Sequence, residues 1–370
     1  MAKYTWTYQA TSNKETGYED MPDKFKLNPD DFCALTDEQQ DQLVAELVAW
    51  IRTKNHFPIY YFNAAGVEEE ILKVAAKKDI KVENDKLITQ SPLGLLLLDY
   101  MFPNLHYVDA GYYDGNCMVN RFYDDAKLAK CLKGYMRRYT LNSMRTAFFQ
   151  LGRMLWQTAI NYAPMRAKAI YEYAAKPGAV VYDYSCGFGG RMLGCLASRN
   201  KYYYIGCEPN TDTFEHLNEL GQAIEAATKR KDTYKIYNQC SEDLQLEPAS
   251  IDFAFSCPPF FAFERYCDEE TQCYNRYKDY NDWLEYYVRP TIKNIYAALK
   301  DDCYMATDIL DFQWRNEVYH LVADWKRIAA EEGFVLDKAI PVLSRSNARK
   351  NGNVNPDKLE QVYFFKKIKK

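Results

Sequence analysis

The sequence predicts an α/β fold with a mostly parallel sheet, preceded by a mainly helical region. From residue 180 onward, short β-branched and aromatic runs alternate with longer amphipathic segments. Strands that alternate with helices are typical of a parallel sheet covered by helices on both faces. The chain has 370 residues, which exceeds the usual size of one hydrophobic core, so we expect more than one domain.

The first 120 residues have the pattern of a mainly helical domain. Thr36 precedes an apolar helical face, and Gln39 follows it at the spacing of a capping box. No motif in this region has a chemistry that the sequence identifies. The other elements expected here are helices at 67–77 and 92–101 and a short strand pair at 80–88.

Two basic regions stand out in a chain of net charge −4. Residues 121–176 contain eleven Lys and Arg against three Asp and Glu, and residues 341–370 contain eight against two. The helical pattern of residues 124–159 also interleaves arginines with aromatic residues, which is typical of surfaces that hold phosphates and stack on bases. We expect a polyanion partner. The alternative is that the arginines only solvate a helix, and we expect its aromatic residues Phe148, Phe149 and Trp156 to lie in the core.

The remaining residues predict a run of strands and helices. The last two strands have no helix between them, so they are expected to form an antiparallel hairpin whose long loop spans 344–357. The expected strands are 180–183, 202–207, 234–238, 251–256, 303–309, 334–342 and 361–366. The expected helices are 166–174, 192–196, 213–228, 282–299 and 316–331.

A glycine turn follows the first of these strands, between Asp183 and Gly190. Glycines let a ligand approach the backbone closely. A dinucleotide fingerprint would place its third glycine where this chain has Met192, so a pyrophosphate cofactor is disfavoured. The turn favours S-adenosylmethionine, which brings no phosphate, although an ordinary tight turn has the same pattern.

The ends of the next two strands carry polar groups. Glu208 lies 19 residues past Gly189, where a carboxylate accepts hydrogen bonds from ribose hydroxyls. The third strand is followed by Ser241 and Glu242, which can contact the edge of an adenine.

The fourth strand runs into Cys257-Pro258-Pro259-Phe260. The two prolines fix φ and remove two donors, which leaves the carbonyls of Cys257 and Pro258 available to a ligand. Phe260 offers a face on which a base can stack. The alternative is a rigid, apolar strand exit with its aromatic rings in the core.

Taken in this order, the turn from Asp183 to Gly189, the acid Glu208 and the turn from Cys257 to Phe260 resemble motifs I, II and IV of the amino-group DNA methyltransferases. The segment Asn161-Tyr162-Ala163-Pro164 is similar to motif X of that family. Residues 252–299 also resemble a phage and bacterial subgroup with a Ser-Pro-Pro-Tyr-Phe motif, through Glu264, Tyr266, Gln272, Tyr274, Tyr277, Trp283 and Pro290.

The resemblance covers roughly residues 160–366. It implies a class I Rossmann-like methyltransferase fold in residues 160–370, with a seven-stranded, mostly parallel sheet. It implies S-adenosylmethionine as cofactor and DNA as partner through the regions 121–176 and 341–370. Residues 1–120 would then be an N-terminal domain with a possible role in target recognition, and 121–159 a basic helical segment.

The resemblance also implies the site residues, and none of them is a metal ligand. The residues expected to bind the cofactor are Asn161, Pro164, Asp183, Ser185, Gly187, Gly189, Glu208, Ser241 and Glu242. Those expected at the reacting centre are Cys257, Pro258, Pro259 and Phe260.

The sequence departs from the family pattern at Cys257, where the family has Asp, Asn or Ser. The sulfur of cysteine is only a weak acceptor. Three functions therefore stay open. They are methyl transfer to the exocyclic amino group of adenine or cytosine in DNA, a Cys257-dependent modification of pyrimidine carbon 5, and a non-catalytic subunit that binds DNA or a protein partner. RNA and small-molecule substrates are further alternatives.

Composition sets the remaining expectations. The fractions of hydrophobic (48%) and charged (26%) residues are ordinary for a globular protein. Eleven cysteines without a C-x-x-C spacing, with only four histidines, favour reduced thiols over a zinc site. The N-terminus lacks the pattern of a signal peptide, and the apolar run 93–98 is too short to span a bilayer. We therefore expect a cytoplasmic protein of a bacterial or phage-infected cell, with a homodimer left open.

Overall fold

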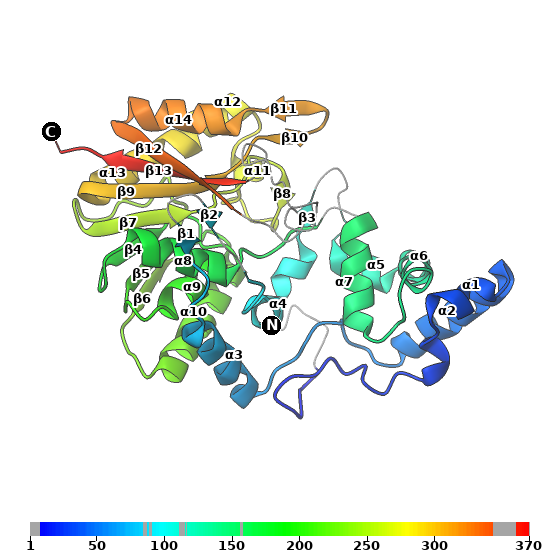
Figure 1. Ribbon diagram of the computed structural model, residues 1–370. Helices are drawn as coiled ribbons and strands as arrows, with labels where there is room; N and C mark the ends of the chain where they lie inside the picture. Colours follow the sequence, from blue (N-terminus) through cyan, green and yellow to red (C-terminus); the bar gives the residue numbers. More distant parts are fainter. Residues whose placement is uncertain are drawn as a thin grey trace. The chain divides into compact units, whose positions relative to one another are not determined.

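The computed structural model divides into two compact units (Figure 1). One unit comprises residues 1–67 and 103–160, and the other comprises 68–102 and 161–370. The division differs from the three segments expected from the sequence, because 121–159 join the N-terminal residues and 68–102 join the sheet. The residues that the structure describes are 8–83, 87–88, 91–110, 115, 117–155, 158–342 and 360–369.

The first unit is mainly helical. Thr36 caps α2 with both bonds of the capping box, as the sequence predicts. The basic helical region forms two helices, α6 and α7, instead of one. The elements are η1 (Asp23–Phe25), α1 (Pro29–Ala34), α2 (Asp37–Arg52), η2 (Pro103–Tyr107), β3 (Asp109–Ala110), α5 (Met118–Tyr123), α6 (Asp125–Met136) and α7 (Met144–Leu155).

Aromatic rings form the core of this unit. The ring of Phe57 meets Phe122, Phe148 and Phe149 edge-on, with ring centres 5.3 to 5.8 Å apart. Phe148 and Phe149 therefore lie in the core, as expected. Trp156, for which the same was expected, lies outside the described residues.

Several basic residues of the first unit are paired with acidic residues or are buried. Lys133 pairs with Asp41 at 2.5 Å, and Arg137 pairs with Asp37 at 2.8 Å, both across to α2. Arg121 is only 2% exposed. These contacts reduce the positive charge that region 121–159 presents to solvent.

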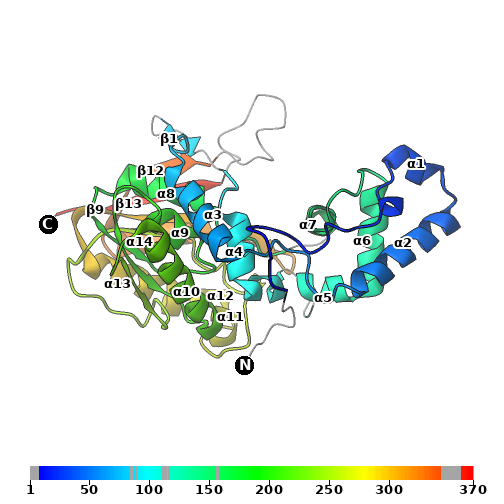
Figure 2. The same ribbon diagram turned by 90° about the horizontal axis from the view of Figure 1, so that it is seen from below.

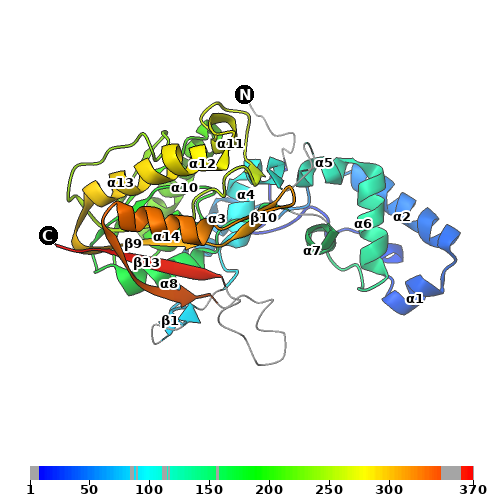
Figure 3. The ribbon, with the colours of Figure 1, turned by 90° about the horizontal axis from the view of Figure 1, so that it is seen from above.

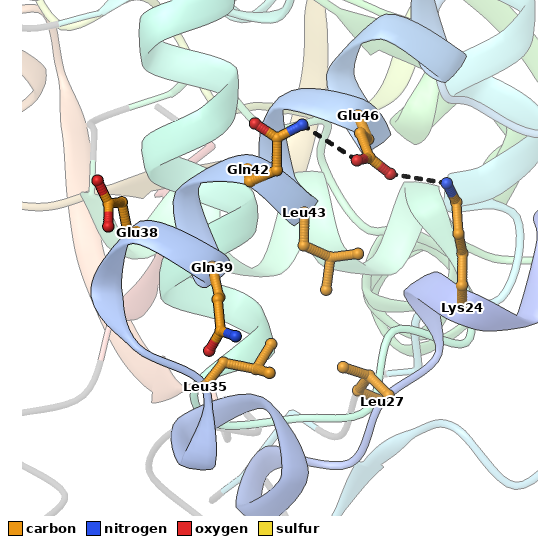
Figure 4. Close-up of a pocket in the computed structure, with 8 residues that line it drawn as sticks. All are labelled: Lys24, Leu27, Leu35, Glu38, Gln39, Gln42, Leu43 and Glu46. Atoms are coloured by element: carbon orange, nitrogen blue, oxygen red, sulfur yellow. Dashed lines mark hydrogen bonds and ion pairs between the residues drawn. The ribbon is translucent and has the colours of Figure 1, made fainter.

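A hollow of about 500 Å³ lies in the first unit beside α2 (Figure 4). Three leucines contribute its apolar wall, and Lys24 pairs with Glu46 at 2.7 Å on its rim. None of the site residues predicted from the sequence lies there. The lining residues are Lys24, Leu27, Leu35, Glu38, Gln39, Gln42, Leu43 and Glu46.

The second unit is built on a seven-stranded sheet whose first strand along the chain, β4, lies in its interior. The order is β12-β13-β9-β7-β4-β5-β6. Only β13 runs antiparallel to its neighbours, and the other pairs are parallel. This is the strand order of the class I Rossmann-like methyltransferase fold, so the predicted fold class is confirmed. The strands are β4 (Val180–Asp183), β5 (Tyr203–Cys207), β6 (Tyr234–Tyr237), β7 (Ile251–Ser256), β9 (Leu299–Ile309), β12 (Phe334–Pro341) and β13 (Gln361–Lys367).

Helices cover both faces of the sheet. Figure 2 shows α8, α9 and α10 on one face, and Figure 3 shows α13 and α14 on the other. The helices are α3 (Ala64–Ala76, which begins in the first unit), α4 (Leu95–Met101), α8 (Pro164–Ala174), α9 (Gly190–Leu196), α10 (Thr211–Thr228), α11 (Cys273–Arg276), α12 (Tyr280–Trp283), α13 (Arg289–Ala298) and α14 (Leu321–Glu331). The short strands are β1 (Val82–Glu83), β2 (Leu87–Ile88) and β8 (Glu264–Arg265). Among the described residues, no helix has the length and apolarity that a bilayer span requires.

One predicted helix is wrong at its start. The expected helix 316–331 begins only at Leu321, because a hairpin of β10 (Phe312–Trp314) and β11 (Glu317–Tyr319) precedes it. The two turn residues, Arg315 and Asn316, both have positive φ (48° and 68°), as a two-residue type I′ hairpin requires. Asn is favoured in such a turn and Arg is not, which made the hairpin hard to predict.

The expected helix 282–299 contains a π-helical stretch, η3 (Leu284–Val288), between α12 and α13. Pro290 follows it and has no N–H to donate to the carbonyl of Tyr286. That carbonyl accepts the hydroxyl of Tyr277 at 3.1 Å instead. The π stretch also places the hydroxyl of Tyr287 3.2 Å from that of Ser185, in the predicted site.

Lys168 explains why residues 68–102 belong with the sheet. Its buried ammonium group donates to the carbonyls of Val74, Ala75 and Lys77 at 2.8 to 3.0 Å. Those carbonyls lie at the C-terminal end of α3, where a helix leaves its last acceptors without partners.

We expect Lys168→Met to lower the free energy of unfolding by about 3 kcal/mol, because it leaves buried carbonyls without donors. Urea unfolding followed by circular dichroism measures the change. The exposed Lys78→Met is the control, and it is expected to change stability by about 0.5 kcal/mol or less. Equal effects of the two substitutions would contradict this role of Lys168.

Candidate functional site

The glycine turn leaves open space beside Gly187. Gly187 and Gly189 both have left-handed backbone, with φ of 55° and 74°. A Cβ at Gly187 would meet no atom closer than 4.0 Å, whereas one at Gly189 would lie 2.6 Å from Leu220. Gly189 is therefore required by packing. Gly187 instead exposes its backbone to a space that a ligand can enter.

Asp183 holds this turn together. It is fully buried, and its carboxylate accepts from the Arg191 Nε at 2.9 Å and the hydroxyls of Tyr204 and Ser256 at 2.8 Å. The backbone N–H of Ser185 donates to it at 3.3 Å. Arg191 also donates to the carbonyl of Ser185. These contacts fix the position of Asp183 at the start of the turn.

The segment from Asn161 to Pro164 lies directly against the turn. The side-chain amide of Asn161 donates to the carbonyl of Phe188 at 2.6 Å. A Cβ at Gly190 would lie 2.0 Å from the carbonyl oxygen of Tyr162, and one at Gly194 would lie 2.3 Å from that of Pro164. The two glycines therefore allow this segment to cross α9.

Glu208 lies beside the open space at Gly187. One carboxylate oxygen accepts from the N–H of Gly187 at 2.9 Å, and the other accepts from the N–H of Asn210 at 3.0 Å. Burial raises the pKa of Glu208 to about 7, and these two hydrogen bonds oppose that shift. The carboxylate therefore titrates near neutral pH.

Ser241 and Glu242 follow β6, on the next loop. The hydroxyl of Ser241 lies 3.0 Å from that of Thr291. One oxygen of Glu242 binds Arg276 at 2.7 Å and the hydroxyl of Tyr277 at 2.8 Å, and burial raises its pKa. Within the described part of the chain, its other oxygen is buried and has no hydrogen-bond partner.

Cys240, Glu242 and Asp243 lie close enough together to hold a cation. Arg276 supplies one, since it pairs with both Glu242 and Asp243. The resemblance did not single out Arg276. Its stretch of sequence mixes tyrosines with other charged and polar residues, so no local pattern distinguished it.

Cys257 follows β7 and is partly buried. Burial raises the pKa of its thiol, and the nearby acids Asp308 and Glu360 raise it further. Arg191 and Arg166 lower it, but the pKa remains raised. The thiol therefore stays protonated at neutral pH. A protonated thiol is a poor nucleophile, which argues against the carbon-5 chemistry.

Phe260 and Phe261 complete this turn. The ring of Phe260 stacks on Phe312, with ring centres 5.8 Å apart and planes 17° apart. Phe261 is buried and has a φ of 52°, a conformation that costs a residue with a side chain about 1 kcal/mol or more.

A buried acid lies beside Cys257 that the sequence analysis did not identify. Ser256 and Thr307 are partners in the parallel pair of β7 and β9, so Asp308 lies at the level of Cys257. Asp308 accepts from the hydroxyl of Tyr162 at 2.6 Å and from Arg166 at 3.0 Å. Burial raises its pKa. An acid near the end of an apolar strand was its signal.

The structure thus links most of the predicted residues at one edge of the sheet. Direct hydrogen bonds join Asn161 and Glu208 to the glycine turn, at the carbonyl of Phe188 and the N–H of Gly187. Ser256 joins that turn to the start of the 257–260 turn through Asp183. The hydroxyl of Tyr277 joins Glu242 to the carbonyl of Tyr286 in η3.

No protein-family model matches the chain, and no curated protein matches it. Among solved structures, the chain is similar to a TehB-like SAM-dependent methyltransferase from Corynebacterium glutamicum, with 17% identity over 60% of this chain and 96% of that one, at a TM-score of 0.36. It is also similar to TrmN from Thermus thermophilus (16%, 55% and 49%, 0.37) and to a SAM-dependent methyltransferase from Aquifex aeolicus (11%, 55% and 98%, 0.35). The case for the site rests on this chain's own residues.

We expect Arg191→Met to destabilise the second unit by about 3–5 kcal/mol, because it leaves the Asp183 carboxylate buried without a cation. Chemical unfolding measures the loss, and Arg191→Lys, which keeps the charge, is expected to lose less. Lys366→Met breaks the more exposed pair with Asp302 (3.3 Å) and is expected to change little. A small effect of Arg191→Met would show that the turn does not depend on this pair.

Proposed function

We propose that the chain binds S-adenosylmethionine at this edge of the sheet and transfers its methyl group to the exocyclic amino group of adenine or cytosine in DNA. The observation that carries the proposal is the open, left-handed Gly187 next to the Glu208 carboxylate. Ligands of open α/β sheets bind at the carboxyl ends of the strands, where both residues lie.

The residues present fit this cofactor. The ribose of S-adenosylmethionine has two hydroxyl donors, and Glu208 offers a carboxylate beside the open space. Its adenine has an amino donor, and the unpartnered oxygen of Glu242 is an acceptor on the next loop. The cofactor would supply a methyl group on a positively charged sulfur.

The turn from Cys257 to Phe260 supports an amino group as the acceptor of methyl. An amine conjugated with its ring is a poor nucleophile, so groups that accept its protons favour the transition state. The protonated thiol of Cys257 is a weak acceptor, which leaves the carbonyl of Pro258 for this role. The base would have to leave the duplex to reach Phe260.

The case for DNA rests on the resemblance of this turn more than on the basic regions. Arg166 and Lys168 are buried, and Lys133 and Arg137 pair with acids of α2. Most of the region 341–370, including the loop 344–357, lies outside the described residues.

A methyltransferase-fold subunit that binds the cofactor and DNA without turnover is the second candidate, and Cys257 is the observation that favours it. Such a subunit would act with a protein partner or as a homodimer. RNA and small-molecule substrates are outcomes that the first experiment separates.

We expect the purified protein to transfer tritiated methyl from S-adenosylmethionine to unmodified DNA, and nucleoside mass analysis to find N6-methyladenine or N4-methylcytosine. Phe260→Ala is expected to lower the rate at least about fivefold, since a base–aromatic stack contributes about 1–3 kcal/mol. Cys257→Ser is expected to raise it. Labelling of RNA but not DNA would contradict DNA as the substrate and favour RNA. Cofactor binding without transfer to any substrate would favour the second candidate.

We expect the affinity for S-adenosylmethionine to increase between pH 6 and pH 8. The pKa of Glu208 is about 7, and its charged form, which accepts hydrogen bonds from ribose hydroxyls, forms as pH rises. The ionised fraction grows about tenfold over this range, which sets the largest expected change in Kd. Calorimetry measures it, with the exposed Glu247→Gln as control.

Glu208→Gln is expected to remove this pH dependence. An affinity that does not change with pH, or one that changes equally in Glu208→Gln, would contradict the role of Glu208.

A further inference from the structure

We propose that the β10–β11 hairpin is part of the target-binding pocket, in which Phe312 and Tyr319 fix the plane of Phe260 so that it receives a flat aromatic ring of the substrate. The inference deepens the proposed function and rests on it, because it assigns the substrate class and two positioning residues to the same site. Neither residue is expected to touch the substrate.

Three rings stack in one column behind the 257–260 turn. The planes of Phe260 and Phe312 differ by 17°, and those of Phe312 and Tyr319 differ by 12°, with ring centres 5.8 and 5.0 Å apart. Phe263 meets the edge of Phe312 at 5.9 Å. Phe312 is only 6% exposed. The orientation of Phe260 is therefore tied to that of the hairpin.

The hairpin also holds the residue after Phe260. Phe261, with its left-handed backbone, packs edge-on against Trp314 at 5.7 Å and lies 6.0 Å from Tyr319. Tyr280 and Trp283 of α12 meet it at 5.7 and 6.0 Å. A strained conformation persists where the surroundings determine it, and two of these four rings come from the hairpin.

The topology places the hairpin at the correct edge of the sheet. It follows β9 directly, and β9 lies next to β7, which leads into Cys257. Both segments therefore leave the sheet at the carboxyl ends of neighbouring parallel strands. A hollow of about 500 Å³, lined among others by Phe261, Trp314 and Tyr319, lies beside the hairpin. Next to this hollow, the hairpin is held by its aromatic contacts with Phe260 and Phe261.

This arrangement favours a planar substrate. One face of Phe260 is used by Phe312, so a ring that stacks on Phe260 takes the plane that the column sets. A nucleobase has such a face, and an aliphatic amine has none. The column thus separates a nucleobase from the small aliphatic substrates that the same fold can serve.

The test compares Phe312→Leu, Phe312→Tyr and Val318→Ala. Val318 is on the same hairpin and 59% exposed, so it is the matched control. We expect Phe312→Leu to lower kcat/KM for DNA about fivefold or more, mainly through KM, with the Kd for S-adenosylmethionine unchanged. Phe312→Tyr keeps the ring and Val318→Ala leaves the column intact, so both are expected to keep kcat/KM within about threefold of the unchanged protein.

A double-mutant cycle shows whether Phe312 acts through Phe260. In a Phe260→Leu background, Phe312→Leu is expected to add little further loss, because the ring that it positions is gone. Additive losses would overturn the proposal. If Phe312→Leu does not fold, Tyr319→Leu replaces it. Tyr319→Phe is then the control, since the Tyr319 hydroxyl bonds only to Glu317 among the described contacts.

A second readout does not need turnover. DNA in which 2-aminopurine replaces part of the adenine is expected to gain fluorescence when that base leaves the duplex for the pocket, because its neighbours in the duplex quench it. Phe260→Leu and Phe312→Leu are expected to reduce this gain, and Val318→Ala to keep it. A fluorescence gain with a protein that transfers no methyl would overturn the proposed function and support the column. Methyl transfer to DNA that is as fast in Phe312→Leu as in Val318→Ala would overturn the column alone, and a protein that shows neither the gain nor the transfer would overturn both.

Discussion

The buried pair of Asp183 and Arg191 is the interaction on which the rest of the second unit's site depends. Asp183 ends the interior strand β4, and its carboxylate binds partners from α9, β5 and β7. A buried carboxylate is tolerated only when its charge and its lone pairs are both satisfied, so these partners are fixed relative to one another. Gly187 and Glu208 are attached to this centre through the turn, and Cys257 is attached to it through Ser256. The proposed cofactor and target sides of the site therefore share one buried anchor.

Much of the fold could be predicted from the sequence, because its signals are local. Hydrophobic runs, the capping box at Thr36 and the missing helix between the last two strands correctly predicted elements and an antiparallel hairpin. The β10–β11 hairpin was missed, since its strands have three residues each and its Arg-Asn turn lacks the usual glycine. The placement of residues 68–102 depends on Lys168, which is more than 90 positions away from its carbonyl partners. No local pattern reports such a contact.

The site shows the same limit. The sequence located the turns at 183–189 and 257–260, but it could not distinguish an acid that faces a ligand from one that holds a turn. The role of Asp183 in cofactor binding stays a prediction, and the structure adds that its carboxylate accepts hydrogen bonds from Arg191, Tyr204 and Ser256. Asp308 and Arg166 are 142 positions apart and meet only because β9 lies beside the start of α8. Residue roles that depend on the register of neighbouring strands require the structure.

The two parts of the 257–260 turn have separate supports. The anchor at Asp183 reaches it through Ser256, whereas Phe260 and Phe261 pack against the β10–β11 hairpin. A cysteine at position 257 changes the acceptor without touching the aromatic contacts. On the proposed function, holding a base and activating its amine are thus separable properties of this chain. A weak acceptor at Cys257 would lower turnover and leave base binding in place. The enzymatic and the non-catalytic candidates therefore share one binding surface, and they differ in how far the Cys257 side chain lowers turnover.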